Sequence, residues 1–386
     1  MTRTTERQAL LPRATGTQRL LTLHRYGSPE ARPKAYLQAA LHADETPGLL
    51  VLHHLVRLLD AAAARSEVTG QIVILPYANP IGLDQNVNGY HLGRQHLGGG
   101  GNFNRNWLDL SEPVAEAVAD RLGSDPAQNV EVIRDALRAF VAGRREALPP
   151  DQLGAELIDH RLRLAQEAVD ADLVLDLHCD LEALMHIFLT PGHWPEAQDI
   201  AAELGCRAAL LAADSGGGSF DEAFSTPWTK LAARFPAHPI PAACLSATVE
   251  LRGRGDVSDA FAEADAAALF RILQRRGFLA GDPGPLPAPL CEGTGLDAVD
   301  VVRAPAAGVL AYRVALGDRV QEGDLVAEVV DPAADPAAAR TPILARTDGL
   351  VLSRHVQFYV TPGTSVAKIV GTKPLPHRSD GSLLED

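Results

Sequence analysis

The chain of 386 residues contains no apolar run near the ~20 residues that a helix needs to cross a bilayer, which predicts no membrane span. Its first residues form no apolar block typical of a secretory signal, so we expect a cytoplasmic protein. The four cysteines include no C-x-x-C pair. This argues against a disulfide framework and against a cysteine-based zinc site.

Lysine is also scarce, and the formal net charge is −14. The four lysines are Lys34, Lys230, Lys368 and Lys373. A surface this negative repels phosphate backbones, which predicts that nucleic acid is not a partner. Arginine carries nearly all the positive charge. That suits bidentate binding of small carboxylates, although an arginine-biased genome explains it equally well.

Apolar residues make up 46% of the chain and charged residues 22%, the mixture of an ordinary globular protein. Short apolar runs predict strands at 35–41, 71–75, 172–177 and 245–251, and helical spacing predicts helices at 46–64 and through most of 111–169. Strands separated by helices predict an α/β fold with helices on both faces of one sheet.

A stretch rich in Pro and Gly at 281–295 predicts a linker. Beyond it, the pattern V-x-x-G-x-x-V-A-x-V-V from Val320 recurs from Val360 as V-x-x-G-x-x-V-A-x-I-V. Two similar halves predict a small β barrel or sandwich. The repeat resembles biotinyl and lipoyl carrier domains, but the joint at 331–342 has no lysine. We therefore expect no lipoyl or biotinyl attachment.

Three residues suggest a metal site. His42 and Glu45 follow the first predicted strand in His42-Ala-Asp-Glu45, and His178 directly follows the run DLVLDL. Open α/β folds place their sites at the carboxyl ends of such strands. Two imidazoles and one carboxylate form a catalytic zinc set that leaves one position for water. With thirteen histidines in the chain, however, H-x-x-E also arises by chance, and structural histidines remain the alternative.

Two further features suggest a reaction. Asn104 and Arg105 follow a glycine run and offer an amide beside a guanidinium, a pair that suits a substrate carboxylate. Glu250 lies within an apolar strand, where a buried acid is costly unless it is paired or functional. Burial raises the pKa of such an acid, which suits a proton shuttle. A structural ion pair with Arg252 or Arg254 is the alternative.

In this order and context, these residues resemble the succinylglutamate desuccinylase/aspartoacylase family of the zinc carboxypeptidase superfamily, over about residues 30 to 370. The residues that carry the resemblance are His42, Glu45, Asn104-Arg105, Asp176-Leu-His178 and Thr248-Val-Glu250. The resemblance implies a zinc-carboxypeptidase-like mixed sheet flanked by helices, with an appended C-terminal β domain. It also implies a zinc-dependent amidohydrolase that removes an acyl group from an N-acylated amino acid or a related small amide.

The resemblance implies that one Zn²⁺ per chain is bound by His42, Glu45 and His178. Glu250 would then act as general base and acid. The implied clamp for the substrate carboxylate is Asn104 with Arg105, and Arg94 is the best match for the family arginine that polarises the scissile carbonyl.

We expect a hydrolase domain over 1–285 with a helical insertion at about 111–170, a linker over 286–295, a barrel-sandwich domain over 296–375 and a tail over 376–386. Two other functions stay open. One is a metallocarboxypeptidase acting on peptide C-termini, and the other is a catalytically inactive binding or scaffold protein. The expected partner is a small N-acyl amino acid, and a homo-oligomer is compatible with the resemblance.

Overall fold

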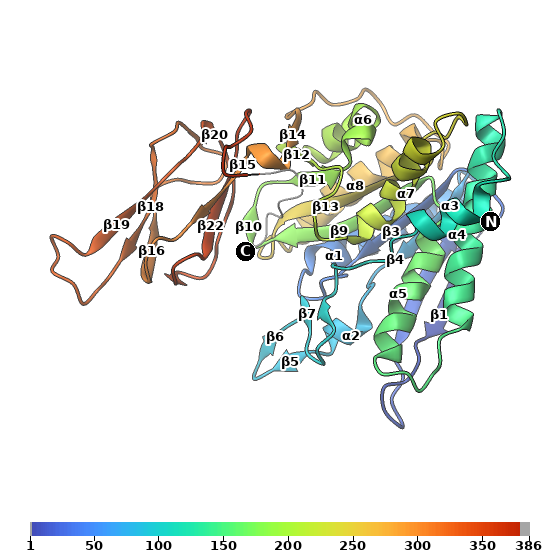
Figure 1. The fold of residues 1–386 in the computed structure, drawn as a ribbon, viewed down its shortest axis with the longest axis horizontal. Helices are drawn as coiled ribbons and strands as arrows, with labels where there is room; N and C mark the ends of the chain where they lie inside the picture. The colour runs from blue at the N-terminus through green and yellow to red at the C-terminus, as the bar shows by residue number, and fades with distance from the viewer. Residues whose placement is uncertain (1, 379–386) are drawn as a thin grey trace.

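The structure, a computed structural model, describes residues 2–378 and has a mixed α/β fold (Figure 1). In sheet order, its largest sheet comprises β1 (Thr4–Ala9), β2 (Leu20–Tyr26), β4 (Gln71–Leu75), β3 (Lys34–Ala39), β9 (Leu173–Asp180), β13 (Leu245–Gly253), β11 (His186–Leu189), β12 (Ala208–Leu211) and β14 (Gly293–Gly295). The central strands β4, β3, β9 and β13 run parallel to one another. The predicted α/β class is confirmed.

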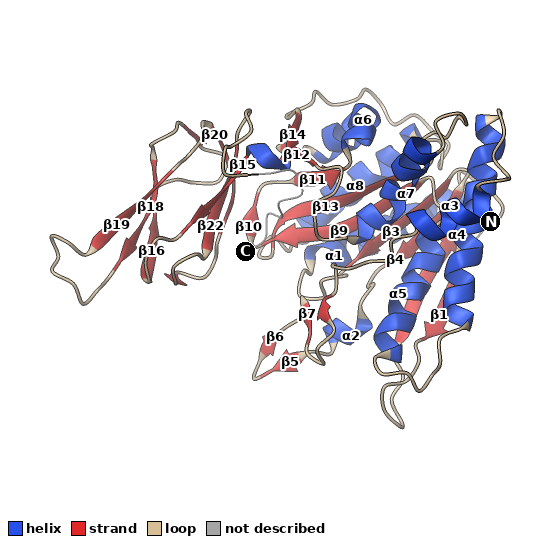
Figure 2. Cartoon of the chain, viewed as in Figure 1, coloured by secondary structure: helices blue, strands red, loops and turns tan. Residues whose placement is uncertain are grey.

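Helices cover both faces of this sheet (Figure 2). One face carries α1 (Pro47–Ala64), α6 (Trp194–Leu204) and α8 (Asp259–Arg275). The other carries α3 (Ser111–Val118), α4 (Pro126–Glu146), α5 (Ala155–Ala168) and α7 (Phe220–Arg234). Within β3, Ala35 and Leu37 join the first core and Tyr36 joins the second, because successive strand residues point to opposite faces.

Helix α1 is long and apolar enough to cross a membrane by length and composition alone. More than half of that helix is buried inside the protein, and its apolar residues belong to the core beneath the sheet. The helix begins at Pro47, as predicted from the favoured position of proline at a helix start. Thr46 precedes it without a capping hydrogen bond from its side chain. We therefore assign α1 as a core helix.

Several predicted boundaries shift. The expected strand at 172–177 continues through Asp180 as β9, so His178 lies within the strand and not after it. The predicted helical stretch divides into α3, α4 and α5, with turns near Gly123 and Pro149. The sequence did not predict β1 and β2, nor the short elements α2 (Pro80–Leu83), β5 (Asn86–Val87), β6 (Tyr90–His91), β7 (Gln95–His96) and β8 (Gly101–Asn102).

Two smaller antiparallel sheets project from one end of the large sheet (Figure 1). One contains β10 (Glu182–Ala183), β20 (Gly349–Arg354), β22 (Ser365–Val370) and β15 (Val299–Arg303), with β17 (Arg319–Val320) beside β20. The other contains β19 (Arg340–Leu344), β18 (Leu325–Val330), β16 (Gly308–Tyr312) and β21 (Tyr359–Val360).

The internal repeat of the sequence corresponds to equivalent strands in these two sheets. Its first copy forms β17 and β18, and its second forms β21 and β22. A Cβ at Gly308 would lie 2.4 Å from the carbonyl oxygen of Val330, and a Cβ at Gly349 would lie 2.4 Å from that of Val370. The same close backbone approach therefore requires glycine in each half.

Candidate functional site

Three side chains meet at one edge of the large sheet. Strand β3 runs parallel to β9 with Gln38 opposite Asp176, so both strands end at the same edge. His42 and Glu45 lie in the loop between β3 and α1, and His178 lies near the end of β9. Their placement follows from the parallel pairing of two strands that are far apart in the sequence.

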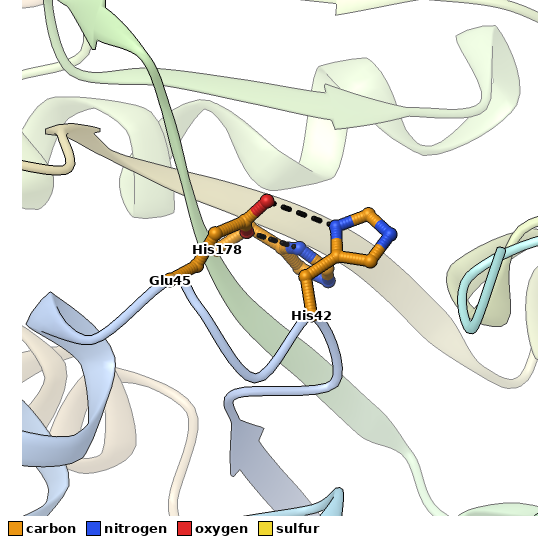
Figure 3. A group of neighbouring side chains, drawn as sticks. All are labelled: His42, Glu45 and His178. Carbon is orange, nitrogen blue, oxygen red and sulfur yellow. Dashed lines mark hydrogen bonds and ion pairs between the residues drawn. The ribbon is translucent and has the colours of Figure 1, made fainter. Parts of the chain in front are cut away.

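The contacts within this group are direct (Figure 3). His42 Nδ1 lies 2.9 Å from Glu45 Oε1, and His178 Nδ1 lies 2.8 Å from Glu45 Oε2. One potential ligand atom from each residue falls within 4.8 Å of the others, and all three side chains are buried. The structure thus brings together the residues predicted to bind the metal, and we call them the metal group.

The second ring nitrogen of each histidine has its own partner. His42 Nε2 donates to Asn102 Oδ1 at 2.7 Å, and His178 Nε2 donates to Asp176 Oδ2 at 2.8 Å. Asn102 Oδ1 also accepts the backbone N–H of Asn104, which fixes the orientation of its amide. Because both partners are acceptors, each Nε2 carries a proton, and each Nδ1 faces Glu45 as the atom that could bind a metal. Asp176 is fully buried, which excludes simple solvation of a strand end.

Electrostatics keep the carboxylate of the metal group ionised. Burial alone would raise the pKa of Glu45, but His42 and His178 outweigh it and hold that pKa well below its ordinary value. Burial lowers the pKa of His42, which favours the neutral imidazole. Burial would lower the pKa of His178 too, but the charges of Asp176 and Glu45 outweigh it and hold that pKa well above its ordinary value, so a cation bound here would displace a proton from His178. An ionised carboxylate and neutral imidazoles are the protonation states in which these groups bind divalent cations.

Arg94 reaches the metal group from the loop after β6. Its Nη1 lies 3.0 Å from Glu45 Oε1 and 3.2 Å from His42 Nδ1. The preceding Gly93 permits this approach, because a Cβ there would lie 2.2 Å from the backbone nitrogen of Asp44. Arg94 therefore lies beside the metal group although the glycine-rich stretch 98–101 separates it from Asn104 in the sequence.

Glu250 lies on β13 directly opposite His178 on β9. Burial and then the negative charge of Glu45 raise the pKa of Glu250 to about 8. Its Oε2 is buried and has no hydrogen-bond partner among residues 2–378. Among residues 2–378, Arg252 pairs with Asp265, and Arg254 pairs with Asp44. The alternative of a structural ion pair between Glu250 and either arginine is therefore wrong for the described residues.

Asn104 and Arg105 follow β8 at the rim of the site. Asn104 Oδ1 accepts the backbone N–H of Phe220 at 2.7 Å, so the Nδ2 end of the amide is its donor. Arg105 Nη1 donates to the backbone carbonyl oxygen of Asn104 at 2.7 Å. Both residues line the same cavity.

A cavity of about 350 Å³ joins these groups. Six of the predicted site residues line it, namely His42, Arg94, Asn104, Arg105, His178 and Glu250. The C-terminal segment also contributes, through Leu296 and Lys368. Lys368 Nζ on β22 donates to Asp180 Oδ2 at 2.8 Å, at the end of β9. The cavity is thus formed by both the large sheet and the smaller sheets.

The sequence did not predict four polar residues of the site: Asn102, Asp180, Asp221 and Lys368. Asp180 is two residues beyond His178 on the same strand, a spacing that could have indicated a shared face. Lys368 lies in the second copy of the repeat, far from the other site residues in the sequence. No pattern in the sequence distinguishes Asn102 or Asp221 from an ordinary polar loop residue.

Comparison with known proteins identifies the family of this chain. Residues 31–276 match the model of the succinylglutamate desuccinylase/aspartoacylase catalytic domain. A search of curated protein sequences finds no match. Among solved structures, a protein of Shewanella frigidimarina described as a succinylglutamate desuccinylase/aspartoacylase is 23% identical, covers 96% of this chain and 98% of its own, and has a TM-score of 0.84.

Two further solved structures have the same fold. A succinylglutamate desuccinylase/aspartoacylase family protein of Shewanella amazonensis is 24% identical over 95% of this chain and 98% of its own, with a TM-score of 0.83. A protein of the same description from Rhodobacter sphaeroides is 17% identical over 96% of each chain, with a TM-score of 0.63. These likenesses to solved structures concern the fold alone. The family assignment rests on the family model, which covers well over half of the chain. The chain belongs to the succinylglutamate desuccinylase/aspartoacylase family.

Proposed function

We propose that this family member is a zinc-dependent amidohydrolase that removes an acyl group from an N-acylated amino acid or a related small amide. The family is one of deacylases, which supports a hydrolase. The observation that carries the proposal is the convergence of two imidazole nitrogens and a carboxylate beside Glu250, whose Oε2 atom is buried and has no hydrogen-bond partner among the described residues.

The metal group suits zinc. Two Nδ1 atoms and one carboxylate are a ligand set of catalytic zinc sites, and the fixed Nε2 atoms of His42 and His178 are the outer contacts that such ligands ordinarily make. Zinc bound there would lower the pKa of a bound water molecule to ~7, and it would polarise the carbonyl group of the substrate.

We assign the proton transfers to Glu250. Its Oε2 is the atom without a partner, so it is available to accept a proton from the attacking water and to deliver it to the leaving amine nitrogen. The charge of Glu45 is the second cause of the raised pKa of Glu250. Binding of a cation by Glu45 offsets that charge, so Glu250 then ionises closer to neutral pH.

The basic and amide groups of the cavity bind and polarise the substrate in this proposal. Arg94 Nη1, next to Glu45, stabilises negative charge that develops on the carbonyl oxygen, which is ordinarily the largest catalytic contribution. Asn104 Nδ2 and the Arg105 guanidinium bind the carboxylate of the amino acid. The hydrogen bond of Asn104 Oδ1 to Phe220 and that of Arg105 to the backbone of Asn104 hold both side chains in place, which reduces the entropy lost on binding.

We further propose the division of the chain that the sequence indicates. Residues 1–285 form the hydrolase unit, with 111–170 as a helical insertion, and 286–295 link it to a β unit over 296–375. The support for a role of that β unit in the site is the placement of Leu296 and Lys368 in the cavity wall. The β unit thereby limits the size of substrates.

The test is Glu250→Gln, compared with the wild-type enzyme after equal zinc loading. The variant should keep its zinc content by elemental analysis and lose about 10²–10⁴-fold in kcat, because it retains the shape of the side chain without a proton acceptor. Glu45→Ala, which removes a metal ligand, should instead lose zinc. A fully active Glu250→Gln enzyme would refute the assignment.

A substrate panel separates the remaining functions. An amidohydrolase of this kind cleaves N-acetyl and N-succinyl amino acids and leaves dipeptides and longer peptides intact, and a carboxypeptidase gives the opposite result. A scaffold protein binds no stoichiometric zinc and hydrolyses neither class after zinc is added.

A further inference from the structure

Asp221 is a buried carboxyl group in the wall of the cavity, and the proposed reaction does not use it. It lies in the first turn of α7, its residue is 5% exposed, and it lines the cavity that contains Glu250. A carboxylate in such a place is costly unless a cation or several donors offset its desolvation.

The groups around Asp221 do not supply a cation. Ser219 Oγ donates to Asp221 Oδ1 at 2.6 Å, and the hydroxyl of Thr248 is its other hydrogen-bonding neighbour. Burial and the nearby charge of Glu222 raise the pKa of Asp221 to about 6. Among residues 2–378, no Lys, Arg or His side chain forms an ion pair with it. Its described surroundings thus provide two hydroxyl groups and a second carboxylate, but no cation.

The neighbouring carboxylate has an evident structural role. Glu222 Oε1 accepts the backbone N–H of Ser215 at 2.6 Å, and Glu222 Oε2 accepts that of Ser219 at 3.1 Å. These bonds complete a capping box at the start of α7. The backbone N–H of Ser219 is therefore capped by Glu222 and not by Asp221.

The other charged groups of the cavity have partners or assigned roles. Arg254 pairs with Asp44, and Lys368 pairs with Asp180. Glu250 carries the proton in the proposed reaction. Asp221 is therefore the acidic group of the described cavity wall that has neither a cation nor a function.

Asp221 also lies close to the proposed carboxylate clamp. The backbone N–H of Phe220, the residue before it, donates to Asn104 Oδ1. On its other side is Thr248, two residues before Glu250 on the same face of β13. An amino acid whose carboxylate is bound by Asn104 and Arg105 would extend its side chain along this wall.

We propose that Asp221 binds the positively charged side chain of the substrate, which is an N-acylated amino acid ending in an ammonium or guanidinium group. This inference rests on the proposed function and specifies its substrate class. The substrate cation forms an ion pair with Asp221 in a site largely closed to water, where such a pair discriminates strongly against a neutral side chain.

The test compares substrates of matched shape. Nα-acetylornithine and Nα-acetyllysine carry the cation, and Nα-acetylnorvaline and Nα-acetylnorleucine are neutral counterparts. We expect the wild-type enzyme to favour the cationic member of each pair by about 30-fold or more in kcat/KM. In Asp221→Asn, this ratio should fall to near one. Asp214→Asn removes the same charge from an exposed position and should leave the ratio intact.

Binding gives a second measurement that does not depend on turnover. Nα-acetylornithine should bind to zinc-loaded Glu250→Gln by calorimetry, and adding Asp221→Asn should weaken its binding by a similar factor. Equal wild-type rates or affinities for cationic and neutral substrates would overturn the role of Asp221 and leave the amidohydrolase intact. If no N-acyl amino acid is hydrolysed, the proposed function fails, and the binding ratio still decides the role of Asp221.

Discussion

The buried carboxyl group of Asp221 also couples the stability of the fold to pH. Burial and the charge of Glu222 raise its pKa from the ordinary 3.8 to about 6. Between these two values the folded protein retains a proton that the unfolded chain releases. The contribution of Asp221 to the free energy of unfolding is therefore greatest below the pKa that this group has in the unfolded chain. It falls as the pH rises from 3.8 to about 6, and it does not change further at higher pH.

Asp221→Asn removes this titration and keeps the shape of the side chain. Relative to wild type, the free energy of unfolding of the variant should rise by up to roughly 3 kcal/mol between about pH 4 and about pH 7. Urea unfolding of both proteins at each pH, at equal zinc content, measures the difference, in which contributions of other titrating groups cancel. A difference that does not vary with pH would contradict the buried, unpaired state of Asp221.

Single residues differ in how far the sequence can predict them. His42, His178 and Glu250 could be found because each lies at or within an apolar strand, where a polar side chain needs a reason. Asn102 could not be found. It holds the His42 ring from 60 residues away, in a two-residue strand, and this contact depends on how a glycine-rich loop folds over the site.

At the scale of elements, the metal group depends on how closely α1 approaches two strands. Gly48 lies in the first turn of α1, and a Cβ there would be 2.8 Å from the Cβ of Ala39 and 3.1 Å from that of Leu177. Ala39 and Leu177 are paired across β3 and β9. Leu177 directly precedes His178, and Ala39 lies three residues before His42. Glycine at this position lets α1 begin directly against the strand ends.

Gly48→Ala should therefore push α1 away from the strands and displace Glu45, which lies in the loop between them. We expect the free energy of unfolding to fall by about 1–3 kcal/mol. Zinc should also be lost more readily to a chelator. Gly143→Ala is the matched control, because Gly143 is exposed in α4 with no atom within 4 Å of the added Cβ. It should stabilise the protein by about 0.5–1 kcal/mol. Equal effects of the two changes would contradict this account of Gly48.

The elements that the sequence predicted are those with a strong apolar pattern. Strand β4 has the expected bounds, and α1 begins at the expected proline. Strand β1, by contrast, has the sequence TTERQA and contains no buried residue, so no apolar alternation reveals it. It forms because β2 offers a free edge, which is a property of the assembled sheet and not of the segment.

For the whole molecule, the smaller sheets are joined to the large one through the segment that follows β9. Strand β10 pairs with β20, so the short segment after β9 becomes an edge of the C-terminal sheet. Arg354 donates two hydrogen bonds of 3.0 Å to Glu182 beside this pairing. The sequence repeat predicted the β unit. It could not predict these contacts, because Arg354 and Glu182 are 172 positions apart, Lys368 and Asp180 are 188 positions apart, and no local pattern encodes such pairs.

Lys368→Met tests whether the C-terminal β unit supports the reaction. The change leaves Asp180 buried without its cation, which should lower the free energy of unfolding by about 3 kcal/mol. Lys368 lowers and Asp180 raises the pKa of Glu250, so the pH profile of kcat/KM should also shift to higher pH. The control, Lys373→Met, removes the same charge from an exposed position. An unchanged pH profile and unchanged stability in Lys368→Met would mean that the β unit lies beside the cavity without acting on it.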